Sequence, residues 1–171
     1  VLSSVCVFAD GELNEADIEN YISFISSFNI INGDPDGNYR LDDLVTRAEF
    51  SKIAVAASEH RNSVAASLSV SPFKDVPYTH WAAPYVKAAL SNKYVNGYED
   101  ASFRPDQNVL FEEAITVFLK LLGYENSDFG SSWPYGPYGI AKNINLVDNM
   151  QSQIGSDLTR REAVILVFNL L

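Results

Sequence analysis

Cysteine is nearly absent from this sequence: Cys6 is the only one among 171 residues, so no disulfide can form within the chain. A small secreted domain usually needs such cross-links, whereas an array of repeats that shares one core can do without them. Long apolar runs are absent as well. None approaches the roughly 20 residues that a membrane-spanning helix requires, so we expect no transmembrane segment.

Positive charge is scarce, because 12 Lys and Arg residues face 22 Asp and Glu residues, giving a formal net charge of -10. Non-specific binding to nucleic acid needs a basic face, so nucleic acid is excluded as a partner. An acidic surface also repels anionic lipid. If the partner is an anionic polymer, a few well-placed cations must do the binding.

Motifs for catalysis are missing too. The sequence contains no nucleophile–base pair, CxxC pair, P-loop or dinucleotide fingerprint. His60 and His80 lack a second metal ligand at useful spacing, so we expect surface or capping roles for them. Glu112 and Glu113 could pair as acid and base, but adjacent residues on a helix point in different directions. We expect neither enzymatic activity nor a cofactor.

What the sequence does contain is one helical pattern repeated three times, at residues 45–58, 109–122 and 158–171. In the last two copies apolar residues recur at i, i+3, i+4 and i+7, which is typical of a buried helix face. These residues are Ile115, Phe118, Leu119 and Leu122, then Val164, Val167, Phe168 and Leu171. The pattern predicts three helices that share one core.

Another helix and a long loop precede each core helix. Asn14, with Asp17 three residues later, is a plausible start for the first, and further helices are expected at about 80–94 and 138–146. The sequence therefore predicts an all-α fold of three helix–loop–helix repeats around a common axis. The modules are residues 10–58, 72–123 and a degenerate 131–171. Residues 1–9 are compatible with either a signal-peptide remnant or a short first strand or loop.

The first two loops align without a gap, at an offset of 64 residues. The matching pairs are Gly33 and Gly97, Asp36 and Asp100, Tyr39 and Phe103, Arg40 and Arg104, and Glu49 and Glu113. Trp81 and Trp133 align at an offset of 52, and the third loop is shorter and has lost the glycine–aromatic–arginine pattern.

Several short motifs in this order resemble the S-layer homology module. They are Phe73-Lys74-Asp75-Val76, His80-Trp81-Ala82, the loop from Asn96 to Pro105, Thr46-Arg47-Ala48-Glu49 and Thr159-Arg160-Arg161-Glu162. The resemblance implies a monomeric, pseudo-threefold, three-pronged helical bundle outside the bacterial cell. It implies non-covalent anchoring to a cell-wall polysaccharide that often carries ketal-linked pyruvate. It also implies ligand grooves between modules, built from the motif arginine, loop glycines and aromatic residues.

The Thr-x-x-Glu spacing at Thr46 and Thr159 is that of a capping box. Arg47 and Arg160 follow in the first helical turn, where the helix dipole disfavours a cation unless an anion also binds there. Arginine grips a carboxylate with two parallel hydrogen bonds, so both are candidate ligand residues. The alternative is a surface arginine or one paired with Asp42 or Asp43. The middle module has Leu110 and Phe111 at these positions, so its groove either is inactive or binds sugar by stacking on Phe111.

Other candidates have two interpretations each. Gly33 and Gly97 are either helix C-cap glycines with positive φ or points of close approach to a sugar. Arg40 and Arg104 either contact ligand or pair with loop carboxylates. Trp81 is expected in the core, with sugar stacking as the alternative, and the same two readings apply to Trp133. Tyr98 likewise either packs in the core or stacks on a sugar.

A calcium-binding module is the competing function. Asn32, Asp34, Asp36, Gly37 and Asp43 fall at positions 1, 3, 5, 6 and 12 of an EF-hand-like loop, as in dockerin-type modules. However, position 12 is Asp rather than Glu, and the aligned second loop keeps only Asp100 of these acids. We therefore favour the wall-anchoring function.

Overall fold

The computed structural model describes residues 13–171, so the expectations for residues 1–9, Cys6 among them, lie outside the described part. The described chain is helical, and only isolated β-bridges occur in it. The elements are α1 (Glu15–Ser26), α2 (Arg47–Ala57), the 3-10 helix η1 (Glu59–Ser63), α3 (Ala83–Ser91), α4 (Phe111–Leu121), α5 (Tyr135–Asn143) and α6 (Arg160–Leu170). The all-α prediction is confirmed. None of these helices combines the length and the apolar character that crossing a bilayer needs.

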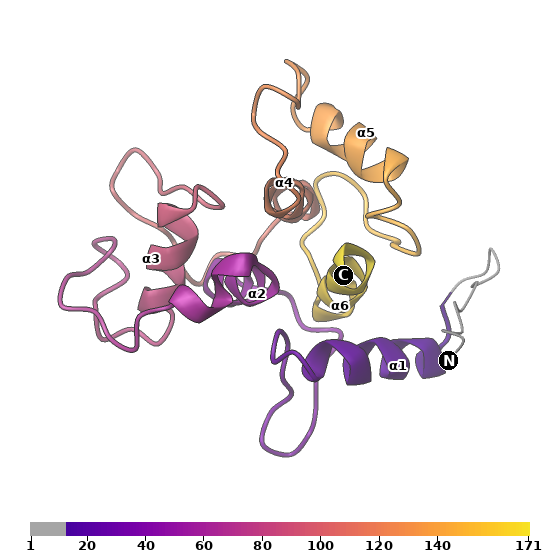
Figure 1. Ribbon diagram of the computed structural model, residues 1–171, viewed down its shortest axis with the longest axis horizontal. Coiled ribbons are helices and arrows are strands. Elements are labelled where there is room, and N and C mark those ends of the chain that lie inside the picture. The colour runs from indigo at the N-terminus through magenta and orange to yellow at the C-terminus, as the bar shows by residue number, and fades with distance from the viewer. Residues whose placement is uncertain (1–12) are drawn as a thin grey trace.

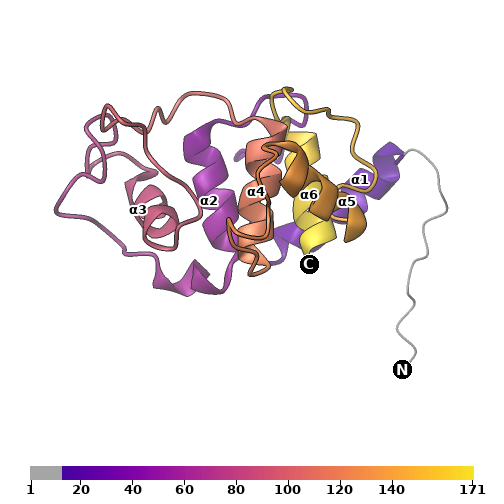
Figure 2. The same cartoon turned by 90° about the horizontal axis from the view of Figure 1, so that it is seen from above.

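Helices α2, α4 and α6 form the centre of the molecule, and α1, α3 and α5 lie outside them (Figure 1). Seen from above, the three central helices stand side by side (Figure 2). The expected core face is buried over most of its length: Ile115, Phe118 and Leu119 on α4 are inaccessible to solvent. The last residues of the pattern differ, since Leu122 and Leu171 are 46% and 55% exposed where the helices end.

The outer helices do not pack within their own sequence repeat. Helix α3 packs on α2, α5 packs on α4, and α1 packs on α6 (Figure 1). The contact between first and last helices includes Tyr21, whose ring stacks on Phe168 with centroids 3.6 Å apart. Each repeat is therefore helix–loop–helix in sequence, but its two helices do not form a packing unit. Long loops let α3 and α5 pack against the core helix of the preceding repeat, and α1 packs against the core helix of the last repeat.

Three backbone hydrogen bonds tie the segments before the core helices into a closed ring. Val45 N donates to Leu158 O (2.9 Å), Leu158 N to Val109 O (2.8 Å), and Val109 N to Val45 O (3.0 Å). Because every member is both donor and acceptor, the buried backbone groups of all three segments are satisfied together. The ring gathers the N-termini of α2, α4 and α6 at one end of the bundle. Pseudo-threefold symmetry stays a prediction, which this ring supports.

The outer helices begin and end differently from the sequence expectation. Asn14 caps α1 as predicted, with its side chain accepting from Asp17 N. Helix α3 begins at Ala83 rather than His80, because the His80 ring instead accepts from Ala82 N in the preceding turn. The N-cap of α3 is Ala82, which has no side-chain cap hydrogen bond, so His80 does not cap this helix. Helix α5 starts and ends three residues earlier than expected, at 135–143.

Gly33 and Gly97 are not the residues that end the outer helices. The left-handed residues after α1, α3 and α5 are Asn29 (φ 56°), Lys93 (φ 60°) and Asn145 (φ 60°). Asparagine is the usual non-glycine residue at such a stop. The prediction of positive φ at the two loop glycines is wrong.

Candidate functional site

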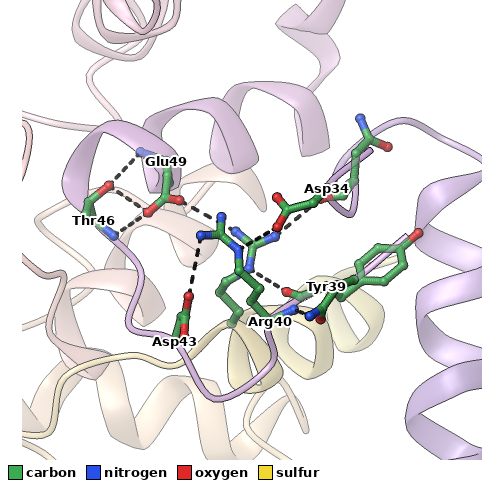
Figure 3. Close-up of polar contacts among 9 residues, drawn as sticks. Asp34, Tyr39, Arg40, Asp43, Thr46 and Glu49 are labelled. Carbon is green, nitrogen blue, oxygen red and sulfur yellow. Dashed lines mark hydrogen bonds and ion pairs between the residues drawn. The ribbon is translucent and has the colours of Figure 1, made fainter. Parts of the chain in front are cut away.

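Capping boxes position the motif arginines at the starts of α2 and α6. Glu49 Oε2 accepts from Thr46 N at 3.0 Å, while Thr46 Oγ1 accepts from Glu49 N at 3.3 Å (Figure 3). Thr159 and Glu162 form the same pair in α6. Both capping predictions are confirmed.

Arg47 links α2 to the loop of the second repeat. Its Nε donates to Phe103 O at 2.9 Å, its Nη2 donates to Asn96 O at 3.0 Å, and its Nη1 lies 3.9 Å from Glu113 Oε1 on α4. The side chain is only 11% exposed. Arg47 therefore connects α2 of the first repeat to the loop and to α4 of the second repeat.

Arg160 makes the same three contacts one interface away. Its Nε donates to Tyr39 O (2.7 Å), its Nη2 to Asn32 O (3.3 Å), and its Nη1 lies 3.7 Å from Glu49 Oε1. Each partner is the residue 64 positions before the partner of Arg47. The suggested pairing of these arginines with Asp42 or Asp43 is wrong, because neighbouring arginines face those carboxylates instead.

A pocket of about 270 Å³ opens beside Arg47. Its lining includes Gly97, Tyr98, Glu113 and Trp133. The Arg47 guanidinium lies 5.1 Å from the centre of the Tyr98 ring, and Arg104 lies 3.7 Å from the same ring. Cation–π contacts of this kind orient a guanidinium without neutralising its charge. The pocket thus combines positive charge with aromatic walls.

Asp75 fixes the loop that carries these aromatic and basic residues. Its carboxylate accepts from Phe103 N at 2.8 Å and from Arg104 N at 2.7 Å. Burial alone would raise its pKa, but the two backbone hydrogen bonds and the charge of Lys74 outweigh burial and lower the pKa of Asp75. Hydrogen bonds from Ser102 likewise lower the pKa of Asp100 to about 2. In the sequence Asp75 is only part of the Phe73–Val76 motif, and nothing there indicates that its carboxylate holds the loop.

Neither tryptophan belongs to the core. Trp133 is 56% exposed and Trp81 is 54% exposed, so the core interpretation is wrong for both. Trp133 lines the pocket beside Arg47. Trp81 stacks on His80, with ring centroids 5.8 Å apart. Both rings are available to contact a ligand.

The loop glycines are required for packing rather than for backbone conformation. A Cβ atom on Gly97 would lie 2.1 Å from Cε1 of Phe73. A Cβ on Gly33 would lie 3.2 Å from Asn38 O. Gly97 therefore lets the Phe73 ring close over the loop, and it also lines the pocket.

Phe111 occupies the arginine position at the third interface. It is 1% exposed and packs edge-on against Tyr138, with ring centroids 6.3 Å apart. Sugar stacking on Phe111 is therefore wrong, because the ring is covered by the protein. The predicted lack of a side-chain cap is confirmed: Glu113 accepts from Leu110 N, but Leu110 has no polar atom to return the bond.

The carboxylates of the EF-hand-like loop are engaged by an arginine. Arg40 Nε lies 3.2 Å from Asp34 Oδ2, and Arg40 Nη1 lies 3.5 Å from Asp43 Oδ2 (Figure 3). Within residues 13–171, no group of three or more His, Cys, Asp or Glu side chains is arranged to hold a metal ion. Arg40 follows the salt-bridge alternative, whereas Arg104 stacks on Tyr98.

Comparison with known proteins identifies the repeat. The family model of the S-layer homology domain matches residues 9–51 and 72–115. Residues 131–171 lie outside both matches, so the third module stays a prediction from the sequence pattern.

Similar proteins come from bacterial surfaces. The chain is 31% identical over 132 residues to the "Middle cell wall protein" of Brevibacillus brevis, covering 77% of this chain and 12% of the relative. It is 40% identical over 92 residues to "Cell surface glycoprotein 1" of Acetivibrio thermocellus, covering 54% of this chain and 4% of the relative. A "Cellulosome-anchoring protein" of the same organism is 28% identical over 102 residues, covering 59% of this chain and 23% of the relative. The chain therefore spans a small part of each relative.

Proposed function

The chain belongs to the S-layer homology domain family, and from that premise we propose that it anchors a surface protein non-covalently to bacterial cell-wall polysaccharide. The family match and the relatives' names support a location at the cell wall or cell surface. The name of the cellulosome-anchoring relative supports an attachment role. In this proposal the chain is a binding module without catalytic activity, and any activity of a longer protein lies elsewhere.

The pocket beside Arg47 is the observation that carries the proposal. A chain with a net charge of -10 repels anionic polymers in general, yet Arg47 lines this pocket between two repeats, and a second guanidinium, that of Arg104, lies on the ring of Tyr98, which also lines it. Trp133 and Tyr98 add flat apolar surfaces suited to the face of a sugar. Cations and aromatic rings together favour an acidic saccharide over a neutral one.

A pyruvate ketal is the acidic group that we propose for this polymer. Its carboxylate is planar, and a guanidinium can bind it with parallel hydrogen bonds. Arg47 and Arg160 already donate to loop carbonyls through Nε and Nη2, which leaves Nη1 facing only a carboxylate at 3.7–3.9 Å. We propose that a ligand carboxylate binds at Nη1 of Arg47, where the existing ion pair is the longer of the two.

Sedimentation with purified cell-wall sacculi tests this function. The unmodified chain should pellet with intact sacculi and stay in solution once the polysaccharide has been removed chemically. The double variant Arg47→Ala/Arg160→Ala should lose at least about tenfold in affinity, as expected when a charge-assisted pair is removed. Lys87→Ala is the matched control, because this lysine is exposed on α3 and far from either motif in sequence.

The outcome separates the alternatives clearly. Retention on stripped sacculi, or unchanged binding by the double variant, contradicts the proposal. Because each arginine also holds a loop, circular dichroism must show that the double variant is folded. Trp133→Ala is the second variant, since its exposed ring can be removed without opening the core, and it should weaken binding while leaving stability unchanged.

A further inference from the structure

The two arginine sites are alike in backbone but carry different side chains at several loop positions, one of which has Asp34 in the first repeat and Tyr98 in the second. Asp34 N donates to Asn38 O at 2.9 Å, and Tyr98 N donates to Ser102 O at 2.8 Å. The carbonyls of both residues accept from the third residue further on, at 2.8 Å for Asp34 and 3.0 Å for Tyr98. The two side chains therefore leave equivalent loops from the same place.

The arginine six residues after this position, Arg40 in the first loop and Arg104 in the second, has a different partner in each loop. In the second repeat Arg104 lies over the neutral Tyr98 ring at 3.7 Å. In the first repeat Arg40 lies 3.2 Å from the Asp34 carboxylate and 3.5 Å from Asp43 (Figure 3). The residue that corresponds to Asp43 in the second repeat is Gln107, which is uncharged. Both loops thus hold a guanidinium, but only the first neutralises it.

These differences between the two loops change the number of charged groups around each motif arginine. At the second-repeat site Arg47 faces Glu113, Arg104 lies on the Tyr98 ring, and Asp75 accepts from Arg104 N, so two carboxylates stand against two arginines. In the first repeat three carboxylates, those of Asp34, Asp43 and Glu49, offset Arg160 and Arg40. Lys52, on α2 three residues beyond Glu49, lines a separate hollow with Phe28 and Tyr85 instead. An incoming carboxylate therefore meets less negative charge at the second-repeat site than at the first-repeat site.

We infer that Asp34 is a built-in anion that closes the Arg160 site to acidic sugars, so that the chain binds a single acidic residue of the polymer, at Arg47. This inference rests on the proposed function and refines it. Arg160 then serves as a structural link between α6 and the first loop, while Arg47 serves both as a link and as a ligand residue. Asp34 is the specificity-determining residue, because it decides how many acidic sugars one chain accepts.

Titration calorimetry with a defined probe tests the inference. The probe is a methyl hexoside that carries a 4,6-linked pyruvate ketal, and its control is the matching isopropylidene ketal, in which a methyl group replaces the carboxylate. The unmodified chain should bind one equivalent of the acidic probe, and Arg47→Ala should abolish that binding. Asp34→Tyr, which installs the residue of the second loop, should bind two equivalents. Adding Arg160→Ala to Asp34→Tyr should return the stoichiometry to one.

Asp34→Asn guards against a steric effect of the tyrosine ring, since it removes the charge alone and should also open the second site. Trp133→Ala should weaken binding of the acidic probe about fivefold, because a stacking surface is lost. Trp81 is the equivalent exposed ring, and Trp81→Ala should leave binding of the probe unchanged. Two equivalents in the unmodified chain overturn the inference, and so does a stoichiometry of one in both Asp34 variants. Absence of binding in every variant, or binding that Arg47→Ala does not affect, overturns the proposed function as well.

Discussion

The start of α4 differs from the starts of α2 and α6, although all three occupy corresponding places in the ring. Helices α2 and α6 begin with Thr-Arg, and their arginines reach across to a neighbouring loop. Helix α4 begins with Leu110 and Phe111, and its interface is closed by the Phe111 ring. Even so, Phe111 N donates to Ser156 O at 2.9 Å, as Arg47 N does to Gln107 O at 2.8 Å.

This difference separates what the fold requires from what the motif adds. The backbone ring and the buried faces of the core helices persist at an interface without threonine or arginine. The Thr-Arg pair is therefore not needed to close the ring. Its arginine brings a guanidinium to an otherwise acidic molecule, and in our proposal the guanidinium of Arg47, whose ion pair with Glu113 is long at 3.9 Å, binds the ligand.

The largest expected effect comes from placing an arginine at the third interface. Phe111→Arg should destabilise the chain by about 3 kcal/mol or more, because a charge would be buried without a partner. The third loop is shorter than the first two and has lost their glycine–aromatic–arginine pattern. Urea denaturation measures the change. Phe111→Leu is the control and should lose only about 1 kcal/mol; equal stability of the two variants would show that this interface accepts a cation after all.

Removing or adding an N-cap side chain should have a smaller effect on stability. Thr46→Val and Thr159→Val should each cost about 1 kcal/mol by removing an acceptor for a helix N–H group. Leu110→Thr should do the reverse and stabilise α4 by up to about 1 kcal/mol, since Glu113 is already in place to complete the box. Thermal unfolding checks all three, with Leu110→Val as the control for changed size. A Leu110→Thr protein no more stable than Leu110→Val would contradict this account.

Acid should produce the smallest effect, and only at the second loop. The pKa of Asp75 is lowered in the folded chain, so its stabilising contribution is present above the unfolded value of about 4 and is lost as pH falls through the folded pKa. Loss of the hydrogen bonds to Phe103 N and Arg104 N should loosen the pocket beside Trp133. Tryptophan fluorescence should therefore titrate below about pH 4. Asp75→Asn should remove that titration, and an unchanged acid profile would show that another group causes it.

The sequence alone was sufficient for the local elements. The 3.6-residue period of Ile115, Phe118 and Leu119 depends on one helix only, and the capping boxes at Thr46 and Thr159 depend on four consecutive residues. The first two loops align without a gap, and Arg47 and Arg160 donate to corresponding residues of these loops. Each of these features arises within a single repeat or from comparing repeats, and needs no knowledge of neighbours in space.

Only the tertiary structure decided which neighbour each part would meet. An apolar stripe specifies that a helix packs but not on what, so α1 on α6 and α3 on α2 could not be distinguished from hairpins within repeats. The exposure of the two tryptophans could not be predicted from the sequence for the same reason, because a large aromatic residue suits a core and a binding surface equally. Likewise, Asp34 beside Arg40 is a loop acid in the sequence and becomes a charge in a site only once the chain has folded. Periodicity and capping are short-range effects, whereas pairing and charge balance depend on groups that folding brings together.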